Sequence, residues 1–260
     1  MQRNALSRNG SGENPWVVRP RAPGEPRLRL FCFPYAGGGP SAFRRWGNHL
    51  PTEVECCLVQ LPGKESRILE SPVRRMDLLV REVHRAIDPL LDRRFAFFGH
   101  SMGGKVAFEL ARELRRAGRP GPAKLFISAT RAPRVPDPDP PLHHLPDGEF
   151  VSEIQSRYDA IPRDVLENRE LLELVLPGLR ADFEVMETHD PGEEPPLECP
   201  ITSCGGLEDD RVGEEGIAGW RAETEGGFEM RMFEGDHFYI QSHEAEFLPY
   251  FRTELEKLLV

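Results

Sequence analysis

A serine stands in a setting that predicts nucleophilic catalysis. Residues 99–103 read G-H-S-M-G and place Ser101 between two glycines. The apolar, aromatic-rich run over 95–98 predicts a strand buried on both faces, and apolar residues at helical spacing over 106–114 predict an amphipathic helix. A G-x-S-x-G motif between a strand and a helix is the nucleophile elbow. Ser101 is therefore predicted to be a nucleophile and not a serine in an ordinary loop.

Two further residues complete a catalytic set. A neutral imidazole must take the serine proton, and a carboxylate must hold that imidazole in one tautomer. His237 follows a predicted strand over 228–233, so its loop is expected to reach the elbow. Asp209 follows a predicted strand over 200–206 and is the preferred acid, while its neighbour Asp210 is the alternative. The chain order serine, acid, histidine is that of α/β-hydrolases.

The sequence also predicts backbone donors for an oxyanion. The N–H of Met102 lies at the positive end of the helix that follows the serine. Three glycines at 37–39 follow a predicted strand over 28–33, without the spacing of a G-x-G-x-x-G phosphate loop and without a Walker lysine. In a serine hydrolase this first loop supplies the second donor, which by position is the N–H of Ala36.

The elements that must position these residues alternate along the chain. Strands are predicted over 28–33, 54–61, 95–98, 124–129, 200–206 and 228–233. Helices are predicted from about 41, over 76–91 with Pro89 ending the regular part, after the elbow, and over 244–259. This order predicts an α/β protein with the α/β-hydrolase fold, in which helices cover both faces of a mostly parallel sheet.

The predicted domain organisation has three parts. Residues 1–26 are rich in proline, glycine and arginine and are expected to form a flexible arm, with Trp16 and 17–18 as the part that could attach to the domain. Residues 27–260 form the hydrolase domain. An insertion over about 131–195 is interpreted as a helical lid or as a packed structural subdomain, with helices over 147–158, 163–168 and 170–187, the last with a kink or break at 177–178.

Composition limits the function further. The chain has 260 residues, a formal net charge of −10 and a pI near 5.4, which argues against nucleic acid as the main partner. The five cysteines form no disulfide framework and are interpreted as mostly buried free thiols. Neither a signal peptide nor a membrane-spanning stretch is visible. A cytoplasmic monomer is the default expectation.

From about residue 28 to its end, the chain resembles the type II thioesterases of polyketide and nonribosomal peptide synthesis. The resemblance rests on a series of motifs in one order: F-P-Y-A-G-G at 33–38, L-P-G-K-E at 61–65 with Arg67, G-H-S-M-G-G at 99–104, L-P-D at 145–147, L-P-G-L-R-A-D-F at 176–183, C-P-I at 199–201, G-x-x-D at 206–209, Trp220, and G-D-H-F at 235–238. The chain departs from the family at Tyr35, where histidine is common, and at 207–210, where the family has an aspartate pair and then proline.

The resemblance implies a hydrolase that cleaves acyl thioesters from the phosphopantetheine arm of acyl or peptidyl carrier proteins. Such enzymes remove stalled or aberrant acyl groups, and they need no metal or cofactor. Carrier proteins are usually acidic, so docking on this acidic chain needs a local basic patch. Candidates are Arg44–Arg45, Arg74–Arg75 and Arg115–Arg116.

Two alternatives stay open. Another hydrolase of the same fold could act on acyl-CoA or on esters, or could transfer the acyl group, and fold and triad alone do not choose between these reactions. A non-catalytic binding scaffold is the second alternative. The complete set of Ser101, Asp209 and His237 argues against the scaffold, because a binding module has no use for it.

Overall fold

The computed structural model describes residues 14–20 and 24–260. The predicted arm over 1–26 therefore lies in large part outside the described residues. In the described part, seven strands form one sheet in the spatial order β1-β3-β2-β4-β5-β6-β7. Their bounds are Val17–Val18 (β1), Leu28–Phe33 (β2), Val54–Val59 (β3), Phe95–His100 (β4), Leu125–Ser128 (β5), Ile201–Gly206 (β6) and Phe228–Phe233 (β7).

Every neighbouring pair in this sheet is parallel except β1 with β3. The antiparallel pairing places Val17 opposite Val59, so part of the segment predicted as an arm forms the edge of the sheet. Parallel strands need crossover connections, and here these connections carry the helices. The fold class predicted from the sequence is confirmed.

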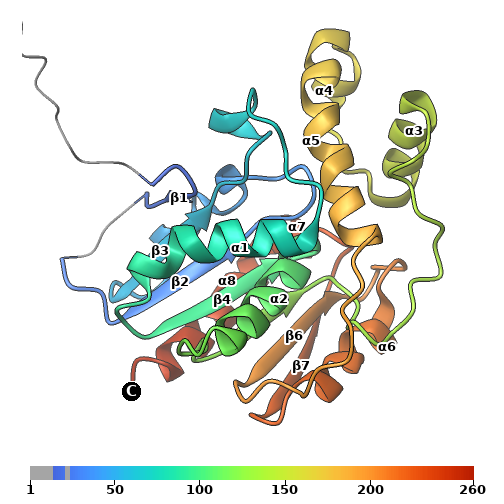
Figure 1. Cartoon of the computed structure of the whole chain (residues 1–260). Coiled ribbons are helices and arrows are strands. Elements are labelled where there is room, and N and C mark those ends of the chain that lie inside the picture. Colours follow the sequence, from blue (N-terminus) through green and yellow to red (C-terminus); the bar gives the residue numbers. More distant parts are fainter. Residues whose placement is uncertain (1–13, 21–23) are drawn as a thin grey trace, which may run out of the picture.

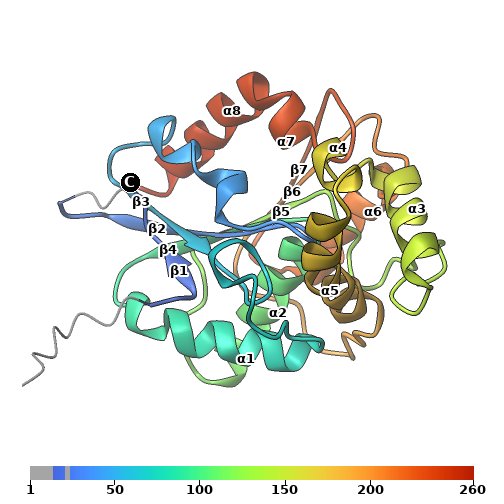
Figure 2. The same cartoon turned by 90° about the horizontal axis from the view of Figure 1, so that it is seen from above.

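Helices cover both faces of the sheet (Figure 1, Figure 2). Helices α1 (Met76–Ile87) and α2 (Met102–Arg116) lie on one face, and α7 (Tyr239–Ser242) and α8 (Glu244–Lys257) lie on the other. The inner strands are buried throughout because each face meets a helix layer. Alternate residues therefore belong to two cores: Phe31 and Phe33 face α1 and α2, whereas Leu30 and Cys32 face α8.

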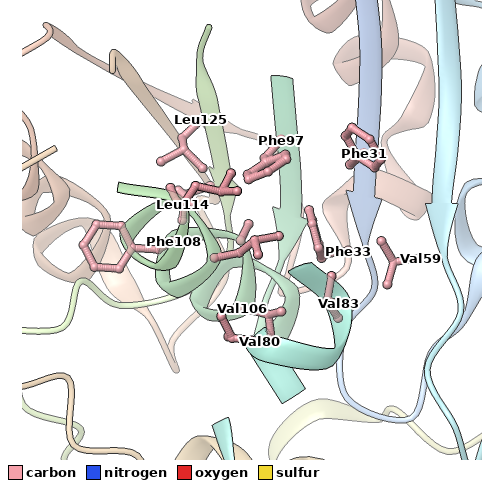
Figure 3. Close-up of a cluster of buried hydrophobic side chains, with 14 of the residues drawn as sticks. Phe31, Phe33, Val59, Val80, Val83, Phe97, Val106, Phe108, Leu114 and Leu125 are labelled. Carbon is pink, nitrogen blue, oxygen red and sulfur yellow. The ribbon is translucent and has the colours of Figure 1, made fainter. Parts of the chain in front are cut away.

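Aromatic rings fill the core beneath α1 and α2 (Figure 3). Phe97 of β4 meets Phe31 and Phe33 of β2 edge to face, with ring centroids 5.8 and 5.3 Å apart. On the opposite face, Trp46 and Phe251 enclose Phe98 at 4.8 and 5.2 Å. These contacts fix β2 and β4 side by side, and the loops after both strands carry predicted site residues.

Short elements and helix ends differ from the sequence predictions. The helix expected from about 41 is a pair of 3-10 turns, η1 (Pro40–Phe43) and η2 (Trp46–Asn48), and Gly47 within the second turn disfavours a continuous α-helix there. Three elements too short to show a periodic pattern were not predicted: α6 (Gly213–Ala218), η5 (Gly219–Glu223) and α7. The remaining 3-10 turns are η3 (Glu65–Arg67) and η4 (Asp88–Leu90), and η4 contains Pro89.

The insertion between β5 and β6 contains three helices, α3 (Asp147–Tyr158), α4 (Arg163–Leu166) and α5 (Arg169–Glu187). They stand above the carboxyl edge of the sheet in Figure 1. Of the kink or break predicted at 177–178, the break is wrong, since α5 runs through Pro177. Gly178 lies so close to the carbonyl of Gly63 that a Cβ there would overlap it, so close packing holds the helix at this turn.

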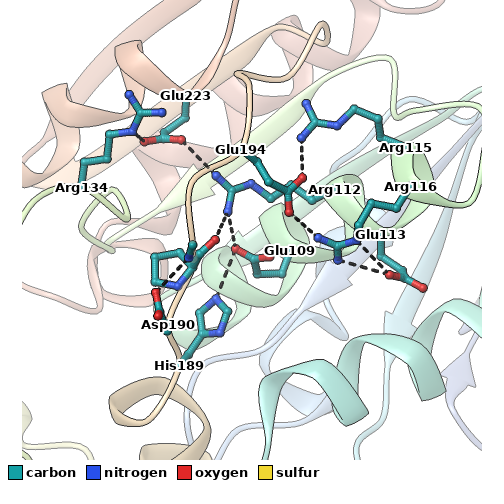
Figure 4. Close-up of polar contacts among 12 residues, drawn as sticks. Glu109, Arg112, Glu113, Arg115, Arg116, Arg134, His189, Asp190, Glu194 and Glu223 are labelled. Carbon is teal, nitrogen blue, oxygen red and sulfur yellow. Dashed lines mark hydrogen bonds and ion pairs between the residues drawn. The ribbon is translucent and has the colours of Figure 1, made fainter.

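A network of charged side chains holds the return segment from α5 to β6 against α2 (Figure 4). Buried Arg112 pairs with Glu109 at 3.0 Å and Glu223 at 3.5 Å, and it donates a hydrogen bond to the carbonyl of Pro191. Arg115 and Arg116 both bind Glu194 of the return segment. The network fixes one wall of the space beside α2.

Among the described helices, none is both long and apolar enough to cross a bilayer.

Candidate active site

The turn around Ser101 is a sharp elbow between β4 and α2. Ser101 has φ 53° and ψ −119°, a conformation that non-glycine residues rarely adopt, and its N–H donates to the carbonyl of Ser128 at 2.8 Å. A Cβ at Gly103 would overlap the carbonyl oxygen of Phe33, and one at Gly99 would overlap that of Gly103. The motif thus needs glycine at both positions, as the sequence predicted.

The three residues predicted to act together form one hydrogen-bonded chain. The Ser101 Oγ lies 3.0 Å from His237 Nε2, and the opposite ring nitrogen, Nδ1, lies 2.8 Å from Asp209 Oδ2. The other Asp209 oxygen accepts the backbone N–H groups of Arg211 and Val212 at 3.1 and 3.2 Å. Asp209 and His237 are both buried, so the carboxylate is held in one orientation toward the imidazole.

Asp210, the alternative acid, points elsewhere. Its side chain is exposed, and both carboxylate oxygens bind the guanidinium of Arg211, at 2.9 and 2.8 Å. This contact lowers the pKa of Asp210 below its ordinary value. In the structure only Asp209 of the two neighbours contacts His237.

The two predicted oxyanion donors lie at the ends of adjacent strands. Ala36 follows β2, and Met102 is the first residue of α2, where the N–H has no partner within the helix. Neither N–H donates a hydrogen bond to another group within residues 14–20 and 24–260. In the sheet, β2 lies between β3 and β4, so the connections from β2 to β3 and from β3 to β4 run in opposite directions across the sheet. At such a switch point, the carboxyl ends of the strands form a crevice.

A buried carboxylate of α5 holds the loop that contains Ala36. The Asp182 Oδ2 accepts the N–H of Gly37 at 2.7 Å, and its Oδ1 lies 2.7 Å from the Lys64 ammonium. Asp182 and Lys64 are only 2% and 4% exposed, so water contributes little to the pair. Burial raises the pKa of Asp182 although Lys64 and the Gly37 amide favour its charged form. One side chain thus joins the insertion, the loop after β3 and the loop after β2.

A cavity of about 350 Å³ opens beside Ser101 and His237. The insertion contributes apolar and aromatic side chains to its wall, among them Ile154, Tyr158, Leu179 and Phe183. The Tyr158 ring centroid lies 5.2 Å from that of His237, and burial, with smaller contributions from Asp137 and Asp139, raises the pKa of Tyr158 to about 12. The shape and lining suit an acyl chain whose reactive carbon lies at Ser101.

The other histidines do not reach the Ser101 hydroxyl. His100 is fully buried, and its Nδ1 lies 2.9 Å from the hydroxyl of Ser128. Burial lowers the pKa of His100 well below its ordinary value, so the ring is neutral. His143 binds Glu187, and His189 lies 3.2 Å from Glu109. The structural role expected for His100 beneath the elbow agrees with these contacts.

Sequence reasoning missed four side chains of the site. Lys64 and Asp182 lie in motifs at 61–65 and 176–183 that carried the family resemblance, yet only the fold shows that they meet across 118 positions of sequence. Lys105 and Tyr158 line the cavity, and each follows a helical pattern that gave no reason to single it out. The spacing of Lys105, four residues after Ser101, was the one available signal.

The chain is similar to known thioesterases over most of its length. A family model described as Thioesterase domain matches residues 28–254. Gramicidin S biosynthesis protein GrsT of Aneurinibacillus migulanus is 39% identical over 246 residues, which cover 95% of this chain and 96% of that protein. The type II thioesterase BorB from the borrelidin biosynthetic cluster has a TM-score of 0.82 at 29% identity, covering 93% of this chain and 96% of that chain. RedJ, a thioesterase of the prodiginine pathway in Streptomyces coelicolor, has a TM-score of 0.82 at 37% identity, covering 90% and 92%.

Proposed function

The chain belongs to the thioesterase family, and we propose that it uses Ser101, Asp209 and His237 to hydrolyse acyl thioesters held on carrier proteins. It is a type II thioesterase of the kind found in nonribosomal peptide and polyketide pathways, where an editing role is the corresponding function. The observation that carries the catalytic proposal is the unbroken chain of contacts from the Ser101 hydroxyl through His237 to Asp209.

The proposed reaction has two steps. His237 Nε2 takes the proton of Ser101 as its Oγ attacks the thioester carbonyl, and the N–H groups of Ala36 and Met102 stabilise the oxyanion. The imidazolium then gives its proton to the departing thiol, which leaves an acyl-serine. Water, deprotonated by His237, attacks this ester and releases the carboxylic acid and free Ser101. Asp209 stays ionised and stabilises the imidazolium in both steps.

Charge pairing narrows the choice of a docking patch for an acidic carrier protein. Arg74 binds Glu184 and Arg75 binds Asp77, and the pair at 115–116 binds Glu194. In the described part of the chain, the exposed side chains of Arg44–Arg45 form no ion pair. They follow the loop of Ala36 in the chain and lie between the turns η1 and η2. We propose that this pair contacts the carrier protein.

The cellular setting forms part of the same proposal. All five cysteines are free thiols, which suits the reducing cytoplasm. A single chain supplies every proposed catalytic group, so a monomer is sufficient for activity.

The test compares one acyl group on a carrier protein and on coenzyme A. We expect kcat/KM to be higher for the carrier, and Arg44→Glu with Arg45→Glu to raise KM for the carrier about tenfold without changing KM for the CoA thioester. Reversal of the charges of Arg85 in α1 and of Arg94, which precedes β4, is the control and should change neither value. Equal kcat/KM for both thioesters would contradict carrier recognition. Cleavage of simple esters without any thioester cleavage would favour the alternative hydrolase.

A further inference from the structure

One face of α2 lines the cavity, and most of its side chains there are polar. Ser101, Lys105, Phe108 and Glu109 all line it, at spacings of four, seven and eight residues from the serine. These spacings place side chains on one side of an α-helix. An acyl group held at Ser101 therefore shares this cavity with the Lys105 side chain. The insertion adds apolar side chains to the wall, among them Tyr158, Leu179 and Phe183, and also the charged side chains of Asp137, Asp139, Arg157 and Glu187.

Lys105 differs from the other cations that line the cavity. Arg157 pairs with Glu153, Arg211 pairs with Asp210, and Arg131 donates to the carbonyl of Arg211. Over residues 14–20 and 24–260, the Lys105 ammonium has neither a hydrogen bond nor an ion pair. The Lys105 side chain is partly buried, so water hydrates its ammonium less completely than it hydrates the ammonium of an exposed lysine.

The charged groups nearest to Lys105 do not satisfy it. Burial lowers the pKa of Lys105, while Asp137 and Glu187 oppose this shift from a distance and Arg131 adds to it. Glu187 is occupied by the backbone N–H groups of Leu142 and His143 and by the His143 ring. A cation without a close partner in a partly desolvated wall gains most when a ligand brings an acceptor oxygen to it.

The position of Lys105 sets the place of that oxygen on the substrate. Four residues of α-helix separate the Cα atoms of Ser101 and Lys105 by about 6 Å along the helix axis. Side chains of a helix lean toward its N-terminus, so the ammonium is directed back toward the serine. The matching acceptor lies a few bonds beyond the thioester carbonyl.

We propose that Lys105 is a specificity-determining residue, which selects acyl groups with an oxygen substituent close to the thioester, a carboxylate foremost, over unsubstituted alkanoyl groups. The inference rests on the proposed function and adds a substrate class to it. Its physical basis is that a polar contact with a partly buried cation, which has no close partner among the described residues, discriminates far more strongly than an additional methylene does.

The test uses three four-carbon acyl groups as pantetheine thioesters: butanoyl, 3-hydroxybutanoyl and succinyl. Spontaneous hydrolysis is measured with the Ser101→Ala protein and subtracted. We expect kcat/KM of the natural protein to be about tenfold or more higher for succinyl than for butanoyl, with 3-hydroxybutanoyl between them. In Lys105→Met, which keeps the length of the side chain, this ratio should fall to about one, and in Lys105→Arg it should be largely retained.

Lys257→Met, which removes an exposed lysine of α8, is the matched control and should keep the ratio of the natural protein. Thermal unfolding of each variant shows that the fold is intact. A succinyl-to-butanoyl ratio near one in the natural protein, or a ratio that Lys105→Met leaves unchanged, overturns the inference while the thioesterase function stands. A natural protein that cleaves none of the three thioesters overturns the proposed function and the inference with it.

Discussion

Replacing Ser101 by alanine is expected to lower kcat for thioester hydrolysis by about four to six orders of magnitude, because it removes the hydroxyl that contacts His237 Nε2. His237→Ala should have a loss of similar size, and the double variant should be little worse than either single variant, since the two residues act as one unit. Steady-state hydrolysis of an acyl-pantetheine thioester measures all three. A loss of less than about tenfold in Ser101→Ala would show that another group performs the attack.

The neighbouring aspartates provide a matched pair for the same prediction. Asp209→Asn should lower kcat by about 10⁴-fold, because the amide cannot stabilise the imidazolium and favours the wrong tautomer of His237. Asp210→Asn removes the same charge one position away and should leave kcat within about twofold, since Asp210 contacts only Arg211. The reverse order of effects would assign the acid role to Asp210.

The second large effect is expected at the buried pair of Lys64 and Asp182. Lys64→Met leaves the Asp182 carboxylate without its cation in a site that is almost closed to water, and it should lower the free energy of unfolding by about 3–5 kcal/mol. Adding Asp182→Asn removes the stranded charge, and the remaining amide oxygen can still accept the N–H of Gly37. The double variant should therefore recover part of the lost stability. Urea unfolding measures both changes.

Catalysis gives an independent measure of the same contact. Asp182→Ala removes the acceptor for Gly37, which is next to the proposed oxyanion donor Ala36. It should lower kcat about tenfold or more, whereas Asp182→Asn, which keeps an acceptor oxygen, should lower kcat less. Equal kcat values in the alanine and asparagine variants would show that the hydrogen bond to Gly37 does not position the loop.

Local patterns were sufficient to predict the fold and the three residues of the hydrogen-bonded chain. The strand over 28–33 and the helix over 147–158 have the bounds that their periodicity predicts. Ser101, Asp209 and His237 each follow a strand, and parallel strands bring their carboxyl ends to one edge of the sheet. The locations of these residues could be predicted because a residue that directly follows a parallel strand lies at the carboxyl edge of the sheet.

Contacts between residues that are far apart in the chain could not be predicted from local patterns. The hydrogen bond from the Gly37 N–H to the Asp182 carboxylate joins residues 145 positions apart, and no local pattern signals which buried acid meets which loop. No local pattern indicates that the Lys105 ammonium lacks a close partner among the described residues, because this depends on all the residues that line the surrounding wall. The continuity of α5 through Pro177 has the same origin, since close packing on the Gly63 loop outweighs the local preference for a break.

Covalent capture of the nucleophile tests the central claim most directly. The protein is treated with a fluorophosphonate, which reacts with activated serines, and the site of modification is located by peptide mass spectrometry. One adduct at Ser101 is expected, formed at a rate that falls at least about 10³-fold in His237→Ala, because the imidazole must activate the hydroxyl. An adduct at another residue, or an unmodified Ser101 in a protein that still hydrolyses thioesters, would contradict the account.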